Sequence, residues 1–296
     1  MKEFFEEYGW SAITLVGGLL GIIISFHLMV GKDSQMAGVV GLFVDTLTKE
    51  PTEAVTFTLA NDIDGNGIIS KGDIIKIDEG LDMNGDGVED TFKVMDKSGN
   101  EVVVIAMDKY KTSKFTDVVS LHEYATEPTA YIKGPRYLET TISDIADEYF
   151  NKMPEKIKKA VVKSIGLSQN MYQLKSGNVS GAELVGTYSS GGSTVTYSLI
   201  KEYSDEIGTK MVYIPDLSDF IRYYGGTVSE ATLQSDFFGS TGKTSRRIWT
   251  RSTLYDTSGS MNNSIATIDS STGKIGQGMT CSSALEVHPM FRLAIN

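Results

Sequence analysis

The chain has 296 residues and a formal net charge of −11 at pH 7, which is enough length for one large domain or two smaller ones with a buried core. Its 41% hydrophobic and 22% charged residues exclude a disordered polypeptide. Affinity for nucleic acid comes from lysine and arginine on phosphates, so an acidic chain is expected to have no nucleic-acid partner. Cys281 is the only cysteine, which excludes a disulfide within the chain and leaves bound metal as the obvious support for its loops.

An apolar run dominates the N-terminal part of the chain. Residues 10–31 contain no Asp, Glu, Lys or Arg, and the run is long enough to span a bilayer as a helix. The acidic flank MKEFFEEYG and the lack of a small-residue cleavage site argue against a removable signal peptide. Helical spacing continues to about residue 49, and Pro51 is a natural stop. The sequence therefore predicts one long helix over residues 1–51, whose membrane orientation the flanking charges leave open.

This segment also carries features that favour self-assembly. Gly17 and Gly21 lie one helical turn apart, which lets helix backbones approach closely in an apolar medium. With its long helix and the Glu7–Tyr8 pair, the segment resembles a type IV-like pilin, more narrowly one of the tight-adherence (Flp) group. The resemblance implies that a glutamate near the start neutralises a neighbouring subunit's amino terminus, and a plain membrane anchor is the alternative. The predicted assembly residues are Glu3, Glu6, Glu7, Tyr8, Gly17 and Gly21.

The strongest chemical signal is residues 62–73, DIDGNGIISKGD. Oxygen-bearing side chains alternate along twelve residues, with Gly67 at the sharp turn, as in the EF-hand calcium loop. Aspartate rather than glutamate at the twelfth position makes the loop resemble those of dockerins, which are common in extracellular bacterial proteins. The predicted calcium ligands are Asp62, Asp64, Asn66, Ile68 through its carbonyl, Ser70 and Asp73.

A second, shorter loop of the same kind follows at residues 82–90, DMNGDGVED. It resembles the aspartate-rich repeats of extracellular calcium proteins, and an ordinary turn is the alternative for each loop. The predicted role of calcium is structural, and it favours a place outside the cell, where calcium is abundant and weak sites suffice. Whether one ion or two bind is left open. The predicted ligands are Asp82, Asn84, Asp86, Val88 through its carbonyl and Asp90.

The remaining sequence alternates between strand and helix patterns. Apolar alternation on both sides of residues 96–100 predicts a β-hairpin. Residues 137–165 have helical spacing that is broken at Pro154, and residues 215–226 predict a short helix that begins near Pro215 and ends at glycine. Residues 185–214 and the last sixty residues predict short strands joined by loops.

The C-terminal part carries a second resemblance. The segments WTRS at 249–252 and VHPMFRLAIN at 287–296 resemble the closing strands of a domain of unknown function on Gram-positive surface proteins, and those of C-type-lectin-like folds. The resemblance spans most of residues 70–296. It implies a fold but no activity.

No catalytic constellation stands out in the sequence. The three histidines are not clustered at metal-ligand spacing, and GSTGKTS at 239–245 has Phe237 where a phosphate loop needs its first glycine. We therefore predict that the protein is not an enzyme.

These observations together predict an α+β fold, in which a long N-terminal apolar α-helix over residues 1–51 precedes a mixed, β-rich, calcium-binding head over residues 52–296. The predicted function is that of a structural subunit of an extracellular pilus-like filament. It would self-associate into a homopolymer through the helix and be inserted in the membrane before assembly. The alternative is a membrane-anchored surface adhesin or glycan-binding module with a host or glycan ligand. Both functions place the protein at the cell surface.

Overall fold

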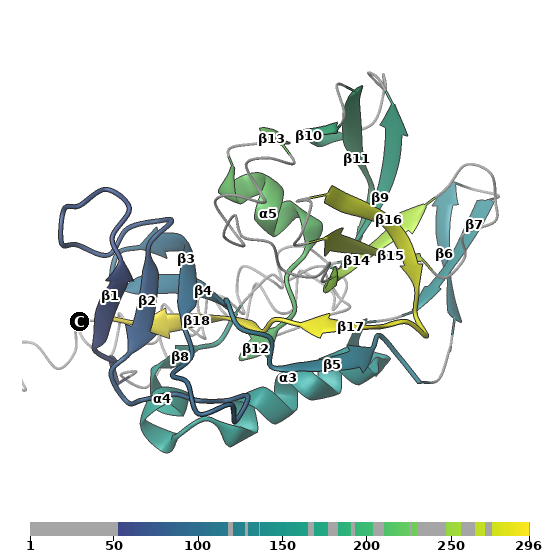
Figure 1. Ribbon diagram of the computed structural model, residues 1–296. Helices are drawn as coiled ribbons and strands as arrows, with labels where there is room; N and C mark the ends of the chain where they lie inside the picture. The colour runs from purple at the N-terminus through teal and green to yellow at the C-terminus, as the bar shows by residue number, and fades with distance from the viewer. Residues whose placement is uncertain are drawn as a thin grey trace, which may run out of the picture. The chain divides into compact units, whose positions relative to one another are not determined.

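The computed structural model describes residues 53–117, 121–127, 130–135, 137–164, 169–176, 183–190, 193–203, 210–224, 227–229, 247–255, 264–269 and 274–295. We call these residues the β-rich domain (Figure 1). The N-terminal segment, with its apolar run and the six predicted assembly residues, lies outside the described residues, as do residues 239–245.

The first sheet of the β-rich domain is antiparallel and has seven strands in the order β1-β2-β3-β4-β18-β12, with β8 also paired to β18. Strand β18 comes from the C-terminal end of the chain and lies between β4 and β12, so the first and last described segments share one sheet (Figure 1). The strands are β1 (Phe57–Asn61), β2 (Ile74–Ile77), β3 (Phe92–Ser98), β4 (Glu101–Ala106), β8 (Val161–Val162), β12 (Val212–Tyr213) and β18 (Met290–Ala294).

The hairpin of β3 and β4 is the one predicted around residues 96–100, which is confirmed. Gly99 and Asn100 form its two-residue turn, and Gly99 has a φ of 57°. A positive φ at the first central position is the type II′ geometry that suits the twist of a hairpin. In β4, Val102 and Val104 are fully buried.

The second sheet has nine strands in the order β13-β10-β11-β9-β14-β15-β16, with β17 paired to β14 and β5. Its pairings are antiparallel except that β14 runs parallel to β9 and β17, and β10 parallel to β13. Strands β6 (Leu121–Glu127) and β7 (Ala130–Pro135) form a separate hairpin. The nine strands are β5 (Lys111–Lys114), β9 (Gln169–Ser176), β10 (Glu183–Ser190), β11 (Ser193–Tyr203), β13 (Thr227–Ser229), β14 (Arg247–Tyr255), β15 (Ser264–Asp269), β16 (Lys274–Thr280) and β17 (Ala284–Val287).

The helices of the β-rich domain are short. A 3-10 turn (Tyr137–Glu139) leads into α3 (Thr141–Lys152), and α4 (Glu155–Ala160) follows after the break predicted at Pro154. In α3, Ile142, Ile145 and Tyr149 are buried at three- and four-residue spacing, so one face of the helix packs on the core. The short helix predicted after Pro215 is α5 (Leu217–Tyr223), which begins with a capping box at Asp216.

Aromatic side chains form the centre of the core. The ring of Phe92 lies edge-on to that of Phe291, with ring centroids 5.6 Å apart, and Tyr149 of α3 lies 6.1 Å from the same Phe291 ring. Trp249 of β14 packs edge-on against Phe115 at 5.3 Å. Burial of one such side chain contributes on the order of 1.5–3 kcal/mol to folding. Strand β18 is therefore held by packing against α3 as well as by its hydrogen bonds.

The predicted fold class needs correction. We expected an α+β fold led by a long apolar α-helix, but the described residues are β-rich, and their longest helix, α3, has 12 residues and is amphipathic. In the part of the chain that the structure describes, no helix has both the length and the apolar character needed to cross a membrane. The prediction of a transmembrane helix is thus contradicted there. That prediction rested on hydropathy, which measures how apolar a segment is but not what the segment packs against.

Candidate metal centre

The first predicted calcium loop connects β1 to β2 (Figure 1) and is shaped by hydrogen bonds of its own side chains. Asp62 Oδ1 accepts from the Gly65 amide at 2.8 Å, and Asp62 Oδ2 accepts from the Gly67 amide at 2.7 Å. Both glycines have a positive φ, 67° and 71°, which residues with a side chain rarely adopt. The Gly67 bond is the main reason why the pKa of Asp62 is lowered. Asp62 therefore stays an anion that can bind a cation.

Three carboxylates converge in this loop. Oxygens of Asp62, Asp64 and Asp73 lie within 4.8 Å of one another. Two oxygens bound to one Ca²⁺ at about 2.4 Å can be separated by at most about 4.8 Å, so this spacing fits a single ion. Among the described residues, none of the three forms an ion pair with lysine or arginine. Like charges held this close repel one another, and a divalent cation would compensate them.

Asp73 is the best-held ligand candidate of the three. It is fully buried, and its two oxygens accept from the Ile63 amide at 3.0 Å and the Ser70 amide at 2.7 Å. The Ser70 hydroxyl bridges Asp73 Oδ2 at 3.0 Å and Asp64 Oδ2 at 3.2 Å. These bonds draw the end of the loop back to its beginning.

The other two predicted ligands lie in the same turn. The Ile68 amide donates to Asn66 Oδ1 at 2.6 Å. The Ile68 side chain is 63% exposed, so it points into solvent rather than into the core. The structure thus brings Asp62, Asp64, Ser70 and Asp73 together, and Asn66 Nδ2 donates to Asp64 Oδ2 at 2.7 Å.

The second loop lies between β2 and β3. It has the same hydrogen bonds as the first loop, at positions twenty residues further along the chain. Asp82 Oδ1 accepts from Gly85 at 2.8 Å, and Asp82 Oδ2 accepts from Gly87 at 3.0 Å. Asp86 Oδ1 accepts from the Val88 amide at 2.8 Å, as Asn66 does from Ile68. Asn84 Oδ1 accepts from the Asp86 amide at 2.9 Å. The shared pattern means that the two loops have the same local backbone.

The closing carboxylate reaches its place differently in the two loops. Asp90 accepts from the Met83 amide at 2.8 Å, as Asp73 accepts from Ile63, although Asp90 is only the ninth residue of its loop. Asp90 is buried. Burial first, and then the negative charges of Asp108, Asp82 and Asp86, raise its pKa to about 6 against the opposing effect of the Met83 bond.

The carboxylates of the second loop are less closely grouped than those of the first. In the part of the chain that the structure describes, the group of three carboxylates whose oxygens lie within 4.8 Å of one another includes no residue of the second loop. Glu89 pairs with Lys76 of β2 at 3.1 Å. The first loop is accordingly the better-formed candidate metal centre.

The donor set indicates the class of metal. Carboxylate, amide, hydroxyl and carbonyl oxygens suit hard cations such as Ca²⁺ and Mg²⁺ rather than zinc or copper. An irregular loop with many oxygens suits Ca²⁺ better, because Mg²⁺ demands near-ideal octahedral geometry. The residues present therefore fit calcium without excluding magnesium.

The first loop is also attached to α5. The Lys71 ammonium lies 5.0 Å from the centre of the Tyr223 ring, and Lys97 of β3 donates to the Ile69 carbonyl at 2.7 Å. A Cβ on Gly72 would lie 3.2 Å from both the Tyr223 hydroxyl and Ile63 Cδ1. A cation that orders this loop would thereby also support α5.

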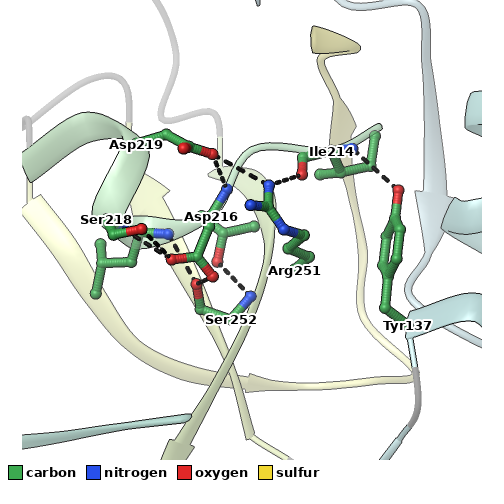
Figure 2. Close-up of polar contacts among 9 residues, drawn as sticks. Tyr137, Ile214, Asp216, Ser218, Asp219, Arg251 and Ser252 are labelled. Carbon is green, nitrogen blue, oxygen red and sulfur yellow. Dashed lines mark hydrogen bonds and ion pairs between the residues drawn. The ribbon is translucent and has the colours of Figure 1, made fainter. Parts of the chain in front are cut away.

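A second polar cluster, around Arg251 of β14, was not predicted from the sequence (Figure 2). Arg251 is buried, donates to the Ile214 carbonyl at 2.6 Å and pairs with Asp219 Oδ2 at 3.1 Å. Buried Asp216 accepts from the Ser252 hydroxyl at 2.7 Å. Because its charges are paired inside the protein, this cluster joins α5 to β14 rather than presenting a reactive group.

The side chains of Cys281 and His288 are buried as well. Burial raises the pKa of Cys281 to about 11, so the thiol is protonated and weakly nucleophilic at neutral pH. His288 Nδ1 lies 2.9 Å from the Ala106 carbonyl, and Nε2 lies 3.4 Å from Glu286 Oε2. These contacts place both side chains in the packing of the domain.

Comparison with known proteins finds no matching family model, no matching curated protein and no matching solved structure. The resemblances to pilins, dockerins and lectin-like surface domains therefore stay predictions.

Proposed function

We propose that this chain is a non-enzymatic structural protein of the cell exterior, whose β-rich domain is stabilised by calcium. The observation that carries the proposal is the convergence of Asp62, Asp64 and Asp73 at the spacing of one ion, without a cationic side chain among the described residues to compensate them. The cation would hold the loop between β1 and β2 in the conformation that contacts α5. Because the chain has no disulfide, the contact between this loop and α5 would link distant parts of the sequence.

The extracellular location follows from the calcium chemistry. Oxygen loops of extracellular modules bind calcium with Kd values of roughly 10⁻⁴ to 10⁻³ M, which suits calcium outside the cell. The paired charges around Arg251 and the buried Cys281 support a structural role over a catalytic one.

A pilus-like filament and a surface adhesin are the two proposed settings for this domain. Glu3, Glu6 and Glu7 favour the filament, because carboxylates in an apolar assembly need a partner. Electron microscopy of material sheared from the cell surface, with the chain identified by mass spectrometry, separates them. Filaments that contain the chain support assembly, and a chain found without filaments supports the adhesin.

Calcium-dependent thermal unfolding of the full chain tests the calcium proposal directly. At a free calcium concentration one hundred times Kd, binding to the folded form adds about 2.7 kcal/mol. With roughly 2–4 °C per kcal/mol for a domain of this size, the Tm should rise by roughly 5–11 °C. Asp73→Asn should lose most of this rise, because it removes a buried ligand charge while keeping the side-chain shape.

Asp117→Asn is the matched control, since Asp117 is an exposed aspartate outside both loops that pairs with Lys114 at 3.3 Å. It should keep the full calcium response. A wild-type Tm that does not respond to calcium at roughly 10–100 mM, about one hundred times the expected Kd, would refute the proposal. An equal response to magnesium would keep the metal centre but remove its selectivity for calcium.

A further inference from the structure

The sequence contains two Asn–Gly dipeptides, Asn66–Gly67 and Asn84–Gly85, and each lies in one of the two loops. Asparagine is a chemically labile residue, and a following glycine makes it most prone to deamidation, because glycine has no side chain to shield its amide nitrogen. Both glycines are exposed, and no atom lies within 4 Å of the place that a Cβ would take. Solvent therefore reaches both dipeptides.

The reaction is an attack of the glycine nitrogen on the side-chain carbonyl carbon of the asparagine. In the first loop a bond would form between the Gly67 nitrogen, which loses its proton, and Asn66 Cγ. The bond from Cγ to Nδ2 breaks, ammonia leaves and a succinimide ring remains. Water then opens the ring. Cleavage between the ring nitrogen and Cγ gives aspartate, and cleavage between the ring nitrogen and the main-chain carbonyl carbon gives isoaspartate. Because both reacting groups belong to one chain, no enzyme is needed.

In the closed first loop, hydrogen bonds hold all the reacting groups. The Gly67 amide donates to Asp62 Oδ2 at 2.7 Å. Asn66 Oδ1 accepts from the Ile68 amide at 2.6 Å, and Asn66 Nδ2 donates to Asp64 Oδ2 at 2.7 Å. Ring closure requires the glycine nitrogen to leave its acceptor and the side-chain amide to turn toward it. The loop must therefore open locally before the reaction can occur.

The second loop holds the same groups of its own dipeptide. The Gly85 amide donates to Asp82 Oδ1 at 2.8 Å. Asn84 Oδ1 accepts from the Asp86 amide at 2.9 Å, and Asn84 Nδ2 donates to Asp86 Oδ2 at 3.2 Å. In each loop the first aspartate, Asp62 or Asp82, thus holds the nitrogen that would attack.

We propose that Asn66 and Asn84 are sites of spontaneous deamidation, that the closed loops protect them, and that loss of calcium exposes Asn66. The role of calcium rests on the proposed function, whereas protection by the hydrogen bonds does not. A reaction that requires an open loop proceeds in proportion to the open fraction. Free calcium at one hundred times Kd would lower that fraction in the first loop by about one hundredfold. Isoaspartate at 66 would lengthen the backbone by one carbon, so a loop that had lost its ion would be altered permanently.

Peptide mass spectrometry of the full chain, incubated at mildly alkaline pH, tests this inference. Samples are kept in calcium, in a chelator, and in a chelator with urea. Both asparagines should deamidate fastest in urea and more slowly in the chelator, and Asn66 should react about one hundredfold more slowly again in saturating calcium. Asn100 is the internal control, because it is exposed but is followed by glutamate. It should stay unmodified in all three samples.

Two variants assign the protection to particular hydrogen bonds. Asp62→Ala removes the acceptor of the Gly67 amide, and in the chelator it should speed deamidation of Asn66 by roughly tenfold, because one hydrogen bond to a charged group changes the open fraction by about this factor. The rate at Asn84 should not change. Asp82→Ala should have the opposite effect, so each variant is the matched control of the other. Circular dichroism in the same buffer verifies the fold, and the wild type in chelator and in urea tests the protection without any variant.

The outcomes separate this inference from the proposed function. The inference is overturned if Asn66 and Asn84 react no faster than Asn100, if the folded calcium-free chain reacts as fast as the chain in urea, or if each variant speeds both sites equally. The calcium proposal would then still stand on its Tm response. A Tm that rises with calcium, together with an unchanged rate at Asn66, would overturn the protection by calcium. A Tm that does not respond would defeat the proposed function, while slower reaction in the folded chain than in urea would still support protection by the loops.

Discussion

Replacing Arg251 by methionine keeps much of the side-chain volume but removes the guanidinium from the cluster of Figure 2. The Arg251 and Asp219 side chains are 3% and 13% exposed, and their charged atoms are 3.1 Å apart. The same guanidinium donates to the Ile214 carbonyl and lies 5.4 Å from the centre of the Tyr213 ring. The substitution would leave a nearly buried carboxylate without its counter-ion.

The size of the effect follows from this burial. Removing one partner of a buried ion pair costs about 3–5 kcal/mol. With roughly 2–4 °C per kcal/mol for a domain of this size, Arg251→Met should lower the Tm by roughly 6–20 °C. Thermal and urea unfolding in saturating calcium, followed by circular dichroism, measures the loss without interference from the metal centre.

A double-mutant cycle with Asp219→Asn shows whether the ion pair is the cause. Asparagine at 219 can still accept the Asp216 amide hydrogen bond, which the carboxylate now accepts at 2.7 Å. The double variant should therefore be more stable than the sum of the single losses predicts, by roughly 0.5–3 kcal/mol. A loss below about 1 kcal/mol for Arg251→Met, or strictly additive losses, would refute this account of the cluster.

Two further predictions concern backbone and surface groups. Gly72 has a φ of 104°, and a Cβ there would lie only 3.2 Å from two side-chain atoms, whereas Gly99 has a φ of 57° and open space around it. Gly99→Ala should cost roughly 1–2 kcal/mol, and Gly72→Ala should cost more. Equal losses in urea unfolding would contradict the contact with Tyr223. Hydrogen bonds from Lys111 and Lys152 lower the pKa of Glu148 to about 2, below an unfolded value of about 4.3. The contribution of the Glu148 carboxylate to stability is therefore present above about pH 4.3 and lost as the pH falls toward 2. Glu148→Gln should flatten the curve of stability against pH in that window. An unchanged slope would count against the ion pairs of Glu148 with Lys111 and Lys152.

The sequence was sufficient where interactions are local. Alternating oxygens and glycines predicted both loops, because each closes through hydrogen bonds between residues at most ten positions apart, such as Asp73 with Ile63. The hairpin at Gly99, the helix break at Pro154 and the short helix after Pro215 were also predictable, since backbone preferences of one or two residues set them.

Prediction failed where partners, rather than local pattern, determine the structure. The prediction of an α+β fold with a long helix is wrong for the described residues, which form two sheets with short helices. A hydropathy pattern does not specify the strand pairings that place β18 between β4 and β12. It also gave no signal for the ion pair of Arg251 with Asp219, which lies 32 residues away in the chain.

The metal centre shows the same division within one site. Consecutive residues determine the composition of each loop and the geometry of its turn, so the sequence alone indicated a cation-binding loop. Contacts such as that of Gly72 with Tyr223 arise only after the sheet and helices have packed. Such contacts join residues that are distant in the chain, and only the packed core brings their side chains within a few ångströms of one another.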